Sequence, residues 1–202
     1  MALFRSIATV GGYTLISRVL GFVRDILLAA ILGASVVADA FFVAFKLPNF
    51  FRRLFAEGAF NAAFIPMFAG LLEKKGRDEA RRFGEEVLSV LLVILVLFVA
   101  LAEMGMPWLL YLLAPGFVDD PMRYDLTTLF ARITFPYLLF ISLVSLMGGV
   151  LNSLGRFAAV AATPILLNLV LIGSLLVLAK FTATPGHALV IGVAVAGFGQ
   201  FL

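Results

Sequence analysis

The stretch VLSVLLVILVLFVALA, residues 87–102, decides which solvent this chain occupies. It contains no charged residue, and its hydrophobic residues follow no amphipathic period. A second stretch, PILLNLVLIGSLLVLA at 164–179, has the same character. A helix of about 20 such residues crosses the hydrocarbon core of a bilayer. Both stretches therefore predict transmembrane α-helices.

The composition of the whole chain supports this prediction. Of 202 residues, 63% are hydrophobic and 13% are charged, whereas soluble domains are near half hydrophobic and a quarter charged. The chain has no cysteine and one histidine, which excludes disulfides, thiolate chemistry and a Cys/His metal cluster. The expected fold class is an all-α polytopic membrane protein.

Six hydrophobic segments are expected to form one transmembrane bundle. The second is too long for one straight span, and we expect a break near Pro48, because proline removes a backbone donor. Such a break is tolerated only where the freed backbone faces protein or a water-filled cavity. The sixth segment ends in GFGQFL with no polar flank, so we expect it to be cut, and the bundle to be the N-terminal lobe of a two-lobed transporter. The segments are 6–32, 37–71, 84–105, 127–152, 158–180 and 187–202.

The loops on the two sides of this bundle differ in charge. The loop EKKGRDEARRFGEE, residues 73–86, holds five basic residues, and Arg5 and Arg156 fall on the same side. The opposite loops hold only Arg123 and Lys180. By the positive-inside rule, the N-terminus and the 73–86 loop are expected in the cytoplasm.

Charged residues also lie within or at the edges of the hydrophobic segments, where each costs roughly 2.5 to 3.5 kcal/mol on insertion scales. They either pair with one another and lock the bundle, or they line a cationic cavity for an anionic substrate. The excess of cations favours the cavity, and arginine suits a phosphate or diphosphate because its planar fork binds two oxygens. The cations are Arg18, Arg24, Lys46, Arg52, Arg53 and Arg132; the acids are Asp25, Asp39, Glu57 and Glu103.

Helical geometry places the polar residues of the first segment on one face, within an arc of about 120°. In the second segment, Asp39, Lys46, Arg53 and Glu57 would align within about 40° if that helix were continuous. No Gly-rich phosphate loop, nucleophile–base pair or carboxylate cluster indicates hydrolysis, so we expect no enzyme: the anion is bound and moved. The residues on the polar face of the first segment are Thr14, Ser17, Arg18, Gly21, Arg24 and Asp25.

Three stretches resemble a known family. ISRVLGFVRD (16–25) and ADAFFVAFKLPNFFRRLFAEGAFNAAFIPMF (38–68) closely resemble the MurJ (MviN) family of lipid II flippases, and GGVLNSLGRFAAVAATPILLN (148–168) is similar to its fourth and fifth helices. The resemblance covers essentially the whole chain but only the N-terminal lobe of a much longer family protein. It implies the multidrug/oligosaccharidyl-lipid/polysaccharide exporter fold, with two helical lobes in a V around a cationic cavity. It also implies a multi-pass protein of the bacterial inner membrane.

The resemblance further implies site residues and partners. Arg24 and Arg18 would pair the diphosphate of lipid II while its undecaprenyl tail stays in the bilayer. A further arginine and a sodium site belong to parts of the family protein outside this chain, so no cofactor is expected here. The expected partners are lipid II, membrane lipids and the cell-wall synthesis machinery, and no nucleic acid. The expected cavity residues are Ser17, Arg18, Arg24, Asp25, Asp39, Asn49, Arg52, Arg53 and Glu57.

Other functions remain open on the sequence. A flippase for O-antigen or exopolysaccharide repeat units would share the cationic cavity but should lack KLPNFFRRLFAEGAF. A membrane scaffold that recruits cell-wall enzymes without transport would tolerate leucine at the intramembrane arginines. An enzyme acting on polyprenyl diphosphate would need acidic or metal-binding groups near the arginines, and Asp25, Asp39 and Glu57 are too few and too scattered.

Overall fold

The computed structural model describes residues 2–53 and 59–202, with side chains from 8–53 and 62–202. Helices joined by short turns make up this described part, in which no strand occurs. The expected all-α fold class is confirmed. The helices are α1 (Ala2–Leu32), α2 (Val36–Arg52), α3 (Ala59–Lys74), α4 (Arg77–Met104), α5 (Met106–Leu113), α6 (Pro121–Thr134), α7 (Tyr137–Ser153), α8 (Phe157–Leu176) and α9 (Pro185–Phe201), with 3-10 turns η2 (Pro115–Phe117) and η3 (Leu178–Lys180).

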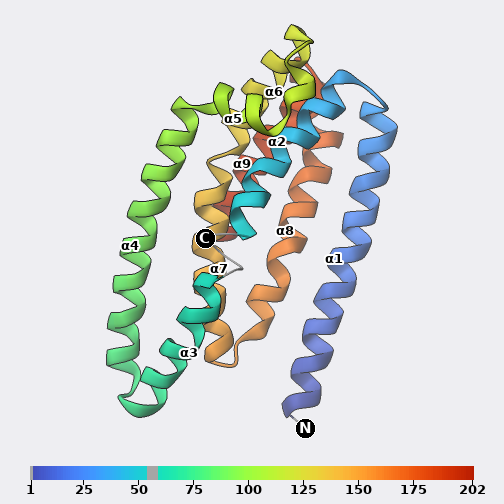
Figure 1. Cartoon of the computed structure of the whole chain (residues 1–202). Coiled ribbons are helices and arrows are strands. Elements are labelled where there is room, and N and C mark those ends of the chain that lie inside the picture. The colour runs from blue at the N-terminus through green and yellow to red at the C-terminus, as the bar shows by residue number, and fades with distance from the viewer. Residues whose placement is uncertain (1, 54–58) are drawn as a thin grey trace.

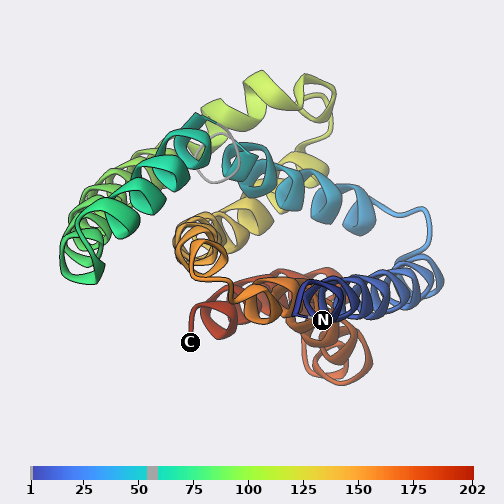
Figure 2. The same cartoon turned by 90° about the horizontal axis from the view of Figure 1, so that it is seen from below.

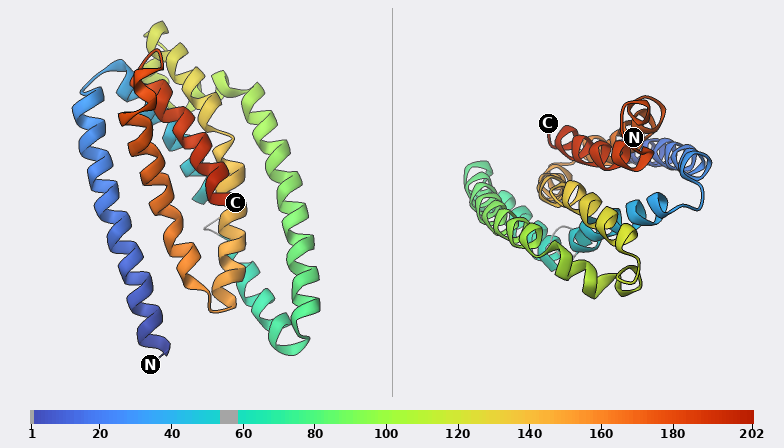
Figure 3. Two further views of the ribbon diagram at one scale, coloured as in Figure 1. Left: turned by 180° about the vertical axis from the view of Figure 1, so that it is seen from behind. Right: turned by 90° about the horizontal axis from the view of Figure 1, so that it is seen from above.

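The long helices run side by side, and the turns between them gather at two ends (Figures 1 and 3). One end holds the N-terminus, the α3–α4 turn and the α7–α8 turn. The other end holds the α1–α2 connection, the α4–α5–α6 region and η3. Seen along the helices, α1, α8 and α9 form one layer and α2, α3 and α4 form another, with α6 and α7 between them (Figure 2). The loops with the predicted basic excess therefore share one end of the bundle.

The surface of the bundle is apolar over much of its length. Within the described part, Arg77–Met104, Pro121–Ser153 and Phe157–Lys180 are long and apolar enough to cross a membrane. On α4 the exposed side chains include Val90, Leu97 and Leu101, which no other helix covers. Such an extended apolar face is stable in lipid and not in water.

Pro48 does not break its helix. It lies buried inside α2, which continues to Arg52, so the helix is not interrupted at Pro48 itself; residues 54–58 lie outside the described part. Proline leaves the carbonyl four residues earlier without its helical donor. That carbonyl belongs to Ala44, and the Thr134 hydroxyl on α6 lies 3.2 Å from it as a donor. A neighbouring helix thus places a donor within reach of this carbonyl, which the hydroxyl shares with the Phe130 carbonyl of its own helix at 3.0 Å.

Two of the expected segments each contain more than one helix. Segment 37–71 falls on α2 and α3, with residues 54–58 outside the described part. Segment 127–152 falls on α6 and α7, because Pro136 follows the end of α6 and precedes Tyr137 at the start of α7. As the N-cap of α7, Pro136 lies where a helix needs no backbone donor.

Helix α9 lies at the centre of the packing, against α2, α6, α7 and α8. Glycines allow its close approach to these neighbours. A Cβ added at Gly186 would lie 2.5 Å from Val37 Cγ1, and one at Gly197 would lie 2.7 Å from Tyr137 Cδ2. Any side chain at these two positions would push α9 away from α2 and α7.

Candidate functional site

Arg24 on α1 is a predicted site residue whose side chain is held in place by hydrogen bonds to two other side chains. Its Nη1 donates to Oδ1 of Asn168 at 2.9 Å, while its Nε and Nη2 donate to Oδ1 of Asp25 at 3.0 and 2.7 Å. The Arg24 side chain is 21% exposed and that of Asp25 is 62% exposed. Three of the five guanidinium N–H groups are therefore engaged, which leaves two for a ligand.

Asn168 joins α8 to α1 through both ends of its amide. Besides accepting from Arg24, it donates from Nδ2 to the backbone carbonyl of Ser17 at 3.1 Å. Asn168 is buried, and Gly21 faces it, so that an added Cβ would sit 3.6 Å from Nδ2. We call Ser17, Arg24, Asp25 and Asn168 the Arg24 cluster.

Sequence reasoning missed Asn168, although a signal was present. It is the amide residue in the uncharged stretch 164–179. Amide side chains inside membrane helices commonly hydrogen-bond to a neighbouring helix. Its partner lies 144 positions away in the chain, which no local pattern reveals.

A hollow of about 770 Å³ lies beside Arg24, next to the connection between α1 and α2. Arg24 and Asp25 form its polar side, and apolar residues form the rest. Because Asp25 and Asn168 fix the guanidinium, its two remaining N–H groups have a set direction. The arrangement can bind two oxygens of an oxyanion through charge-assisted hydrogen bonds. The apolar lining residues are Leu28, Ala29, Gly33, Ala34 and Phe42.

Arg18 does not join the Arg24 cluster. Its side chain is exposed, and it has no hydrogen bond or ion pair within the part of the chain that the structure describes. It lies about 9 Å from Arg24 along the helix axis. Ser17 is half-buried and contributes its backbone carbonyl to the cluster. The predicted polar stripe of α1 is thus divided between a face packed on α8 and an exposed face.

Asp39 on α2 pairs with a different arginine from those of α1. Arg123 Nη2 lies 3.5 Å from Asp39 Oδ2, and its Nε lies 3.7 Å from Asp120 Oδ2. The Arg123 guanidinium also stacks over the ring of Phe117, 5.2 Å from its centroid. Arg123 belongs to the end of the bundle where only two basic residues were predicted. The pair ties the start of α2 to the start of α6.

The other predicted residues of α2 lie near its end. Asn49 donates from Nδ2 to the carbonyl of Phe45 on its own helix at 2.8 Å. Arg52 is half-buried, and Arg53 is exposed at the end of α2. Glu57 lies outside the described residues. The structure therefore places the predicted site residues in several locations and not in one cluster.

No group of three or more His, Cys, Asp or Glu side chains within the described ranges could hold a metal ion. The polar groups of the Arg24 cluster that line the hollow are one guanidinium and one carboxylate, and the guanidinium N–H groups not used by Asp25 and Asn168 are hydrogen-bond donors to an oxyanion.

Comparisons with known proteins give the family. The family model described as "Lipid II flippase MurJ" matches residues 28–202. A probable lipid II flippase MurJ of Rhizobium meliloti (strain 1021) is 53% identical over 176 residues, which are 87% of this chain and 33% of that protein. The lipid II flippase MurJ of Burkholderia cenocepacia is 40% identical over 202 residues, 100% of this chain and 39% of that protein, so its match includes the Arg24 region.

A solved structure agrees with the sequence comparisons. The lipid II flippase MurJ in an inward closed conformation superimposes with a TM-score of 0.76 at 28% identity, covering 95% of this chain and 40% of that chain. The chain spans about a third to two fifths of the length of these relatives. On the family model, these relatives and the shared fold, the chain belongs to the MurJ family of lipid II flippases.

Proposed function

We propose that this chain forms one lobe of a transporter that moves lipid II from the cytoplasmic to the periplasmic leaflet for cell-wall synthesis. The observation that carries the proposal is the orientation of Arg24. Asp25 and Asn168 fix its guanidinium beside a hollow, and two N–H groups remain for a ligand. Membership of the MurJ family supports lipid II as the source of the oxyanion.

The proposed mechanism uses the Arg24 cluster as the anchor for the diphosphate of lipid II. The guanidinium binds two phosphate oxygens, which a bidentate fork does better than a point charge. The undecaprenyl tail stays in the bilayer, against the apolar outer face of the helices. Rocking of this lobe against a second lobe then exposes the headgroup on the other side.

We propose that the end of the bundle with the N-terminus and the α3–α4 turn faces the cytoplasm of a bacterial inner membrane. The positive-inside rule supports this orientation, since the basic loops share that end. Single cysteines are introduced into protein that carries no other cysteine, which in this chain needs no substitution, so that each reports its own position. A membrane-impermeant maleimide applied to intact cells should label Asp119→Cys and should label Lys75→Cys only after permeabilisation. Labelling of Lys75→Cys in intact cells would reverse the orientation.

The transport proposal is tested by complementation in bacteria depleted of their own lipid II flippase. The protein, expressed from its complete natural gene, should restore growth and remove the accumulated lipid-linked precursor. Arg24→Leu should do neither, whereas Arg82→Leu should do both, because Arg82 is an exposed residue near the start of α4. Full rescue by Arg24→Leu at equal membrane levels would favour a scaffold that does not transport.

A further inference from the structure

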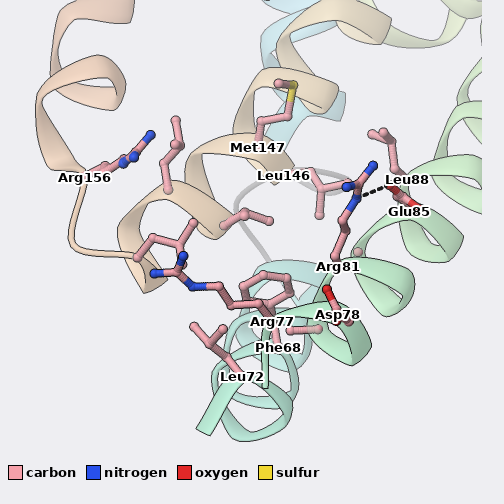
Figure 4. Close-up of a pocket in the computed structure, with 15 residues that line it drawn as sticks. Phe68, Leu72, Arg77, Asp78, Arg81, Glu85, Leu88, Leu146, Met147 and Arg156 are labelled. Atoms are coloured by element: carbon pink, nitrogen blue, oxygen red, sulfur yellow. Dashed lines mark hydrogen bonds and ion pairs between the residues drawn. The ribbon is translucent and has the colours of Figure 1, made fainter. Parts of the chain in front are cut away.

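A second hollow lies at the opposite end of the bundle from the Arg24 cluster. It measures about 720 Å³ and opens where α3, α4 and α7 meet beside the α7–α8 turn (Figure 4). We call it the α3–α4 groove. No step of the proposed transport mechanism uses its residues.

Apolar side chains from three helices line much of the α3–α4 groove, and the Arg81–Glu85 pair lies beside Leu88 and Leu146 (Figure 4). Phe68 and Leu72 come from α3, Leu88 from α4 and Leu146 from α7 (Figure 4). On α7 the apolar lining begins at Leu146, about 10 Å from the end of that helix at Ser153. This length is about two thirds of the hydrocarbon thickness of one bilayer leaflet, which is about 15 Å.

The mouth of the groove carries an unpaired positive charge. Arg77 and Arg156 line it, and neither has an ion-pair or hydrogen-bond partner within residues 2–53 and 59–202. Arg81 also lines the groove, but Glu85 neutralises it through a bond of 2.7 Å from Nε to Oε1. Asp78 is the remaining acid of the lining and offsets only one of the two unpaired arginines.

The position of these features along the helices selects the kind of ligand. The arginines lie at the turns that end α3 and α7, and the apolar wall is formed mainly by α7, with Leu88 at the start of the apolar stretch of α4. A ligand that satisfies both parts has a phosphate at one end and a hydrocarbon chain at the other. Basic pockets between membrane helices commonly bind the headgroups of anionic lipids in this way.

We propose that the α3–α4 groove binds an anionic phospholipid of the adjacent leaflet. Its phosphate contacts Arg77 and Arg156, and one acyl chain packs on Phe68, Leu88 and Leu146. Bound there, the lipid fills the space between the α3–α4 hairpin and α7. A zwitterionic lipid binds less well, because its cationic headgroup approaches the same two arginines.

The test measures lipid retained by protein that is expressed from its complete natural gene and purified in detergent. Phosphatidylglycerol and phosphatidylcholine with the same acyl chains are added, and the bound lipid is counted by native mass spectrometry. Phosphatidylglycerol should be retained preferentially. The double variant Arg77→Gln/Arg156→Gln should lower its affinity about thirtyfold, from the usual contribution of one basic residue near a lipid phosphate applied twice.

The matched control is Lys75→Gln/Arg82→Gln, which removes the same charge from the same end but does not line the groove. It should leave retention unchanged. Met147→Trp tests the apolar part separately, because Met147 lines the groove, is 43% exposed and carries no charge. It should lower retention of phosphatidylglycerol by filling the space for the acyl chain. Circular dichroism and monodispersity establish that each variant is folded.

Several results would overturn the proposal. Equal losses in the two double variants would mean that diffuse surface charge binds the lipid. Equal retention of both phospholipids would mean that the headgroup does not determine binding. Unchanged retention by Met147→Trp would mean that the acyl chain does not bind in the groove. Retention of undecaprenyl diphosphate that falls in Arg77→Gln/Arg156→Gln and not in Arg24→Leu would assign the groove to the transported lipid instead.

Discussion

Arg24 of α1 donates a 2.9 Å hydrogen bond to the buried amide of Asn168 on α8, and the same amide donates back to α1 at Ser17. Asn168 on α8 therefore helps to position Arg24 on α1, the residue that we propose to contact the substrate. Since the two bonds lie on either side of Gly21, they resist both sliding and rotation of α1 against α8. The two helices should move as one unit when the lobe rocks.

Removing the amide should loosen this unit. Asn168→Leu breaks both bonds to α1, one of them to a charged group, and should destabilise the protein by about 1 to 3 kcal/mol. Thr14→Val is the control, because its hydroxyl bonds only to Val10 within α1. Thermal unfolding in detergent measures both variants. Equal stability of the two would show that the Asn168 bonds do not hold α1 in place.

Asp25 is expected to orient Arg24 and not to carry a proton. Asparagine at this position keeps an oxygen that can accept from Arg24, whereas alanine removes it. Growth rescue should therefore fall in the order wild type, Asp25→Asn, Asp25→Ala. If Asp25→Asn failed as completely as Asp25→Ala at equal membrane levels, the charge or proton of Asp25 would be the required feature.

The bond between Thr134 and the carbonyl of Ala44 should depend on Pro48. Thr134→Val leaves that buried carbonyl without a donor, which costs about 1 to 3 kcal/mol. In a Pro48→Ala background the alanine supplies a backbone N–H, so the same substitution should cost less than about 1 kcal/mol. A double-mutant cycle of unfolding free energies measures the difference. Equal costs in both backgrounds would mean that the hydroxyl serves its own helix, through the Phe130 carbonyl 3.0 Å away.

The pair between Asp39 and Arg123 should contribute little to stability. Both side chains are partly exposed, at 51% and 31%, and the nearest atoms are 3.5 Å apart. Such pairs are worth about 1 kcal/mol or less. Asp39→Asn and Arg123→Gln should each shift the unfolding temperature only slightly. A loss of growth rescue by Asp39→Asn without loss of stability would then assign Asp39 to transport, whereas a large loss of stability would contradict its exposed setting.

The membrane fold could be predicted from the sequence because its signal is local. A run such as 87–102 has no polar group that water could solvate, so its environment follows from composition. The length of the 37–71 segment also excluded a single straight helix. The continuation of α2 through Pro48 could not be predicted, because Thr134, far along the chain, lies within hydrogen-bond distance of the carbonyl that Pro48 leaves without a donor.

Part of the candidate site could also be predicted, because its signal is local in the sequence. The sequence identified Arg24 and Asp25 because charges inside an apolar segment are expensive and conspicuous. It did not identify Asn168 as the partner of Arg24, nor Arg123 as the partner of Asp39, because each pair joins segments that are far apart in the sequence. A helical wheel also placed Arg18 and Arg24 on one stripe, yet packing against α8 covers only the part of that stripe that contains Arg24. Charge balance alone therefore identifies candidate residues but not their grouping.

The decisive variant for the proposed function is Arg24→Lys. Arginine contacts Asp25 and Asn168 through three N–H groups and keeps two in a fixed plane for the diphosphate. A lysine ammonium has three N–H groups in all, so it cannot make these contacts and also offer a bidentate fork. Arg24→Lys should therefore rescue growth poorly, near the level of Arg24→Ala, although it preserves the charge.

The comparison is made in flippase-depleted cells, with membrane levels checked by blot and Arg82→Lys as the control at an exposed position. Arg82→Lys should rescue fully, because an exposed arginine in a weak pair at 3.9 Å from Glu79 needs only its charge. Full rescue by Arg24→Lys would show that transport requires positive potential and not a fork. The diphosphate contact at Arg24 would then have to be replaced by a diffuse cationic surface, in which the exposed Arg18 would be an equal contributor.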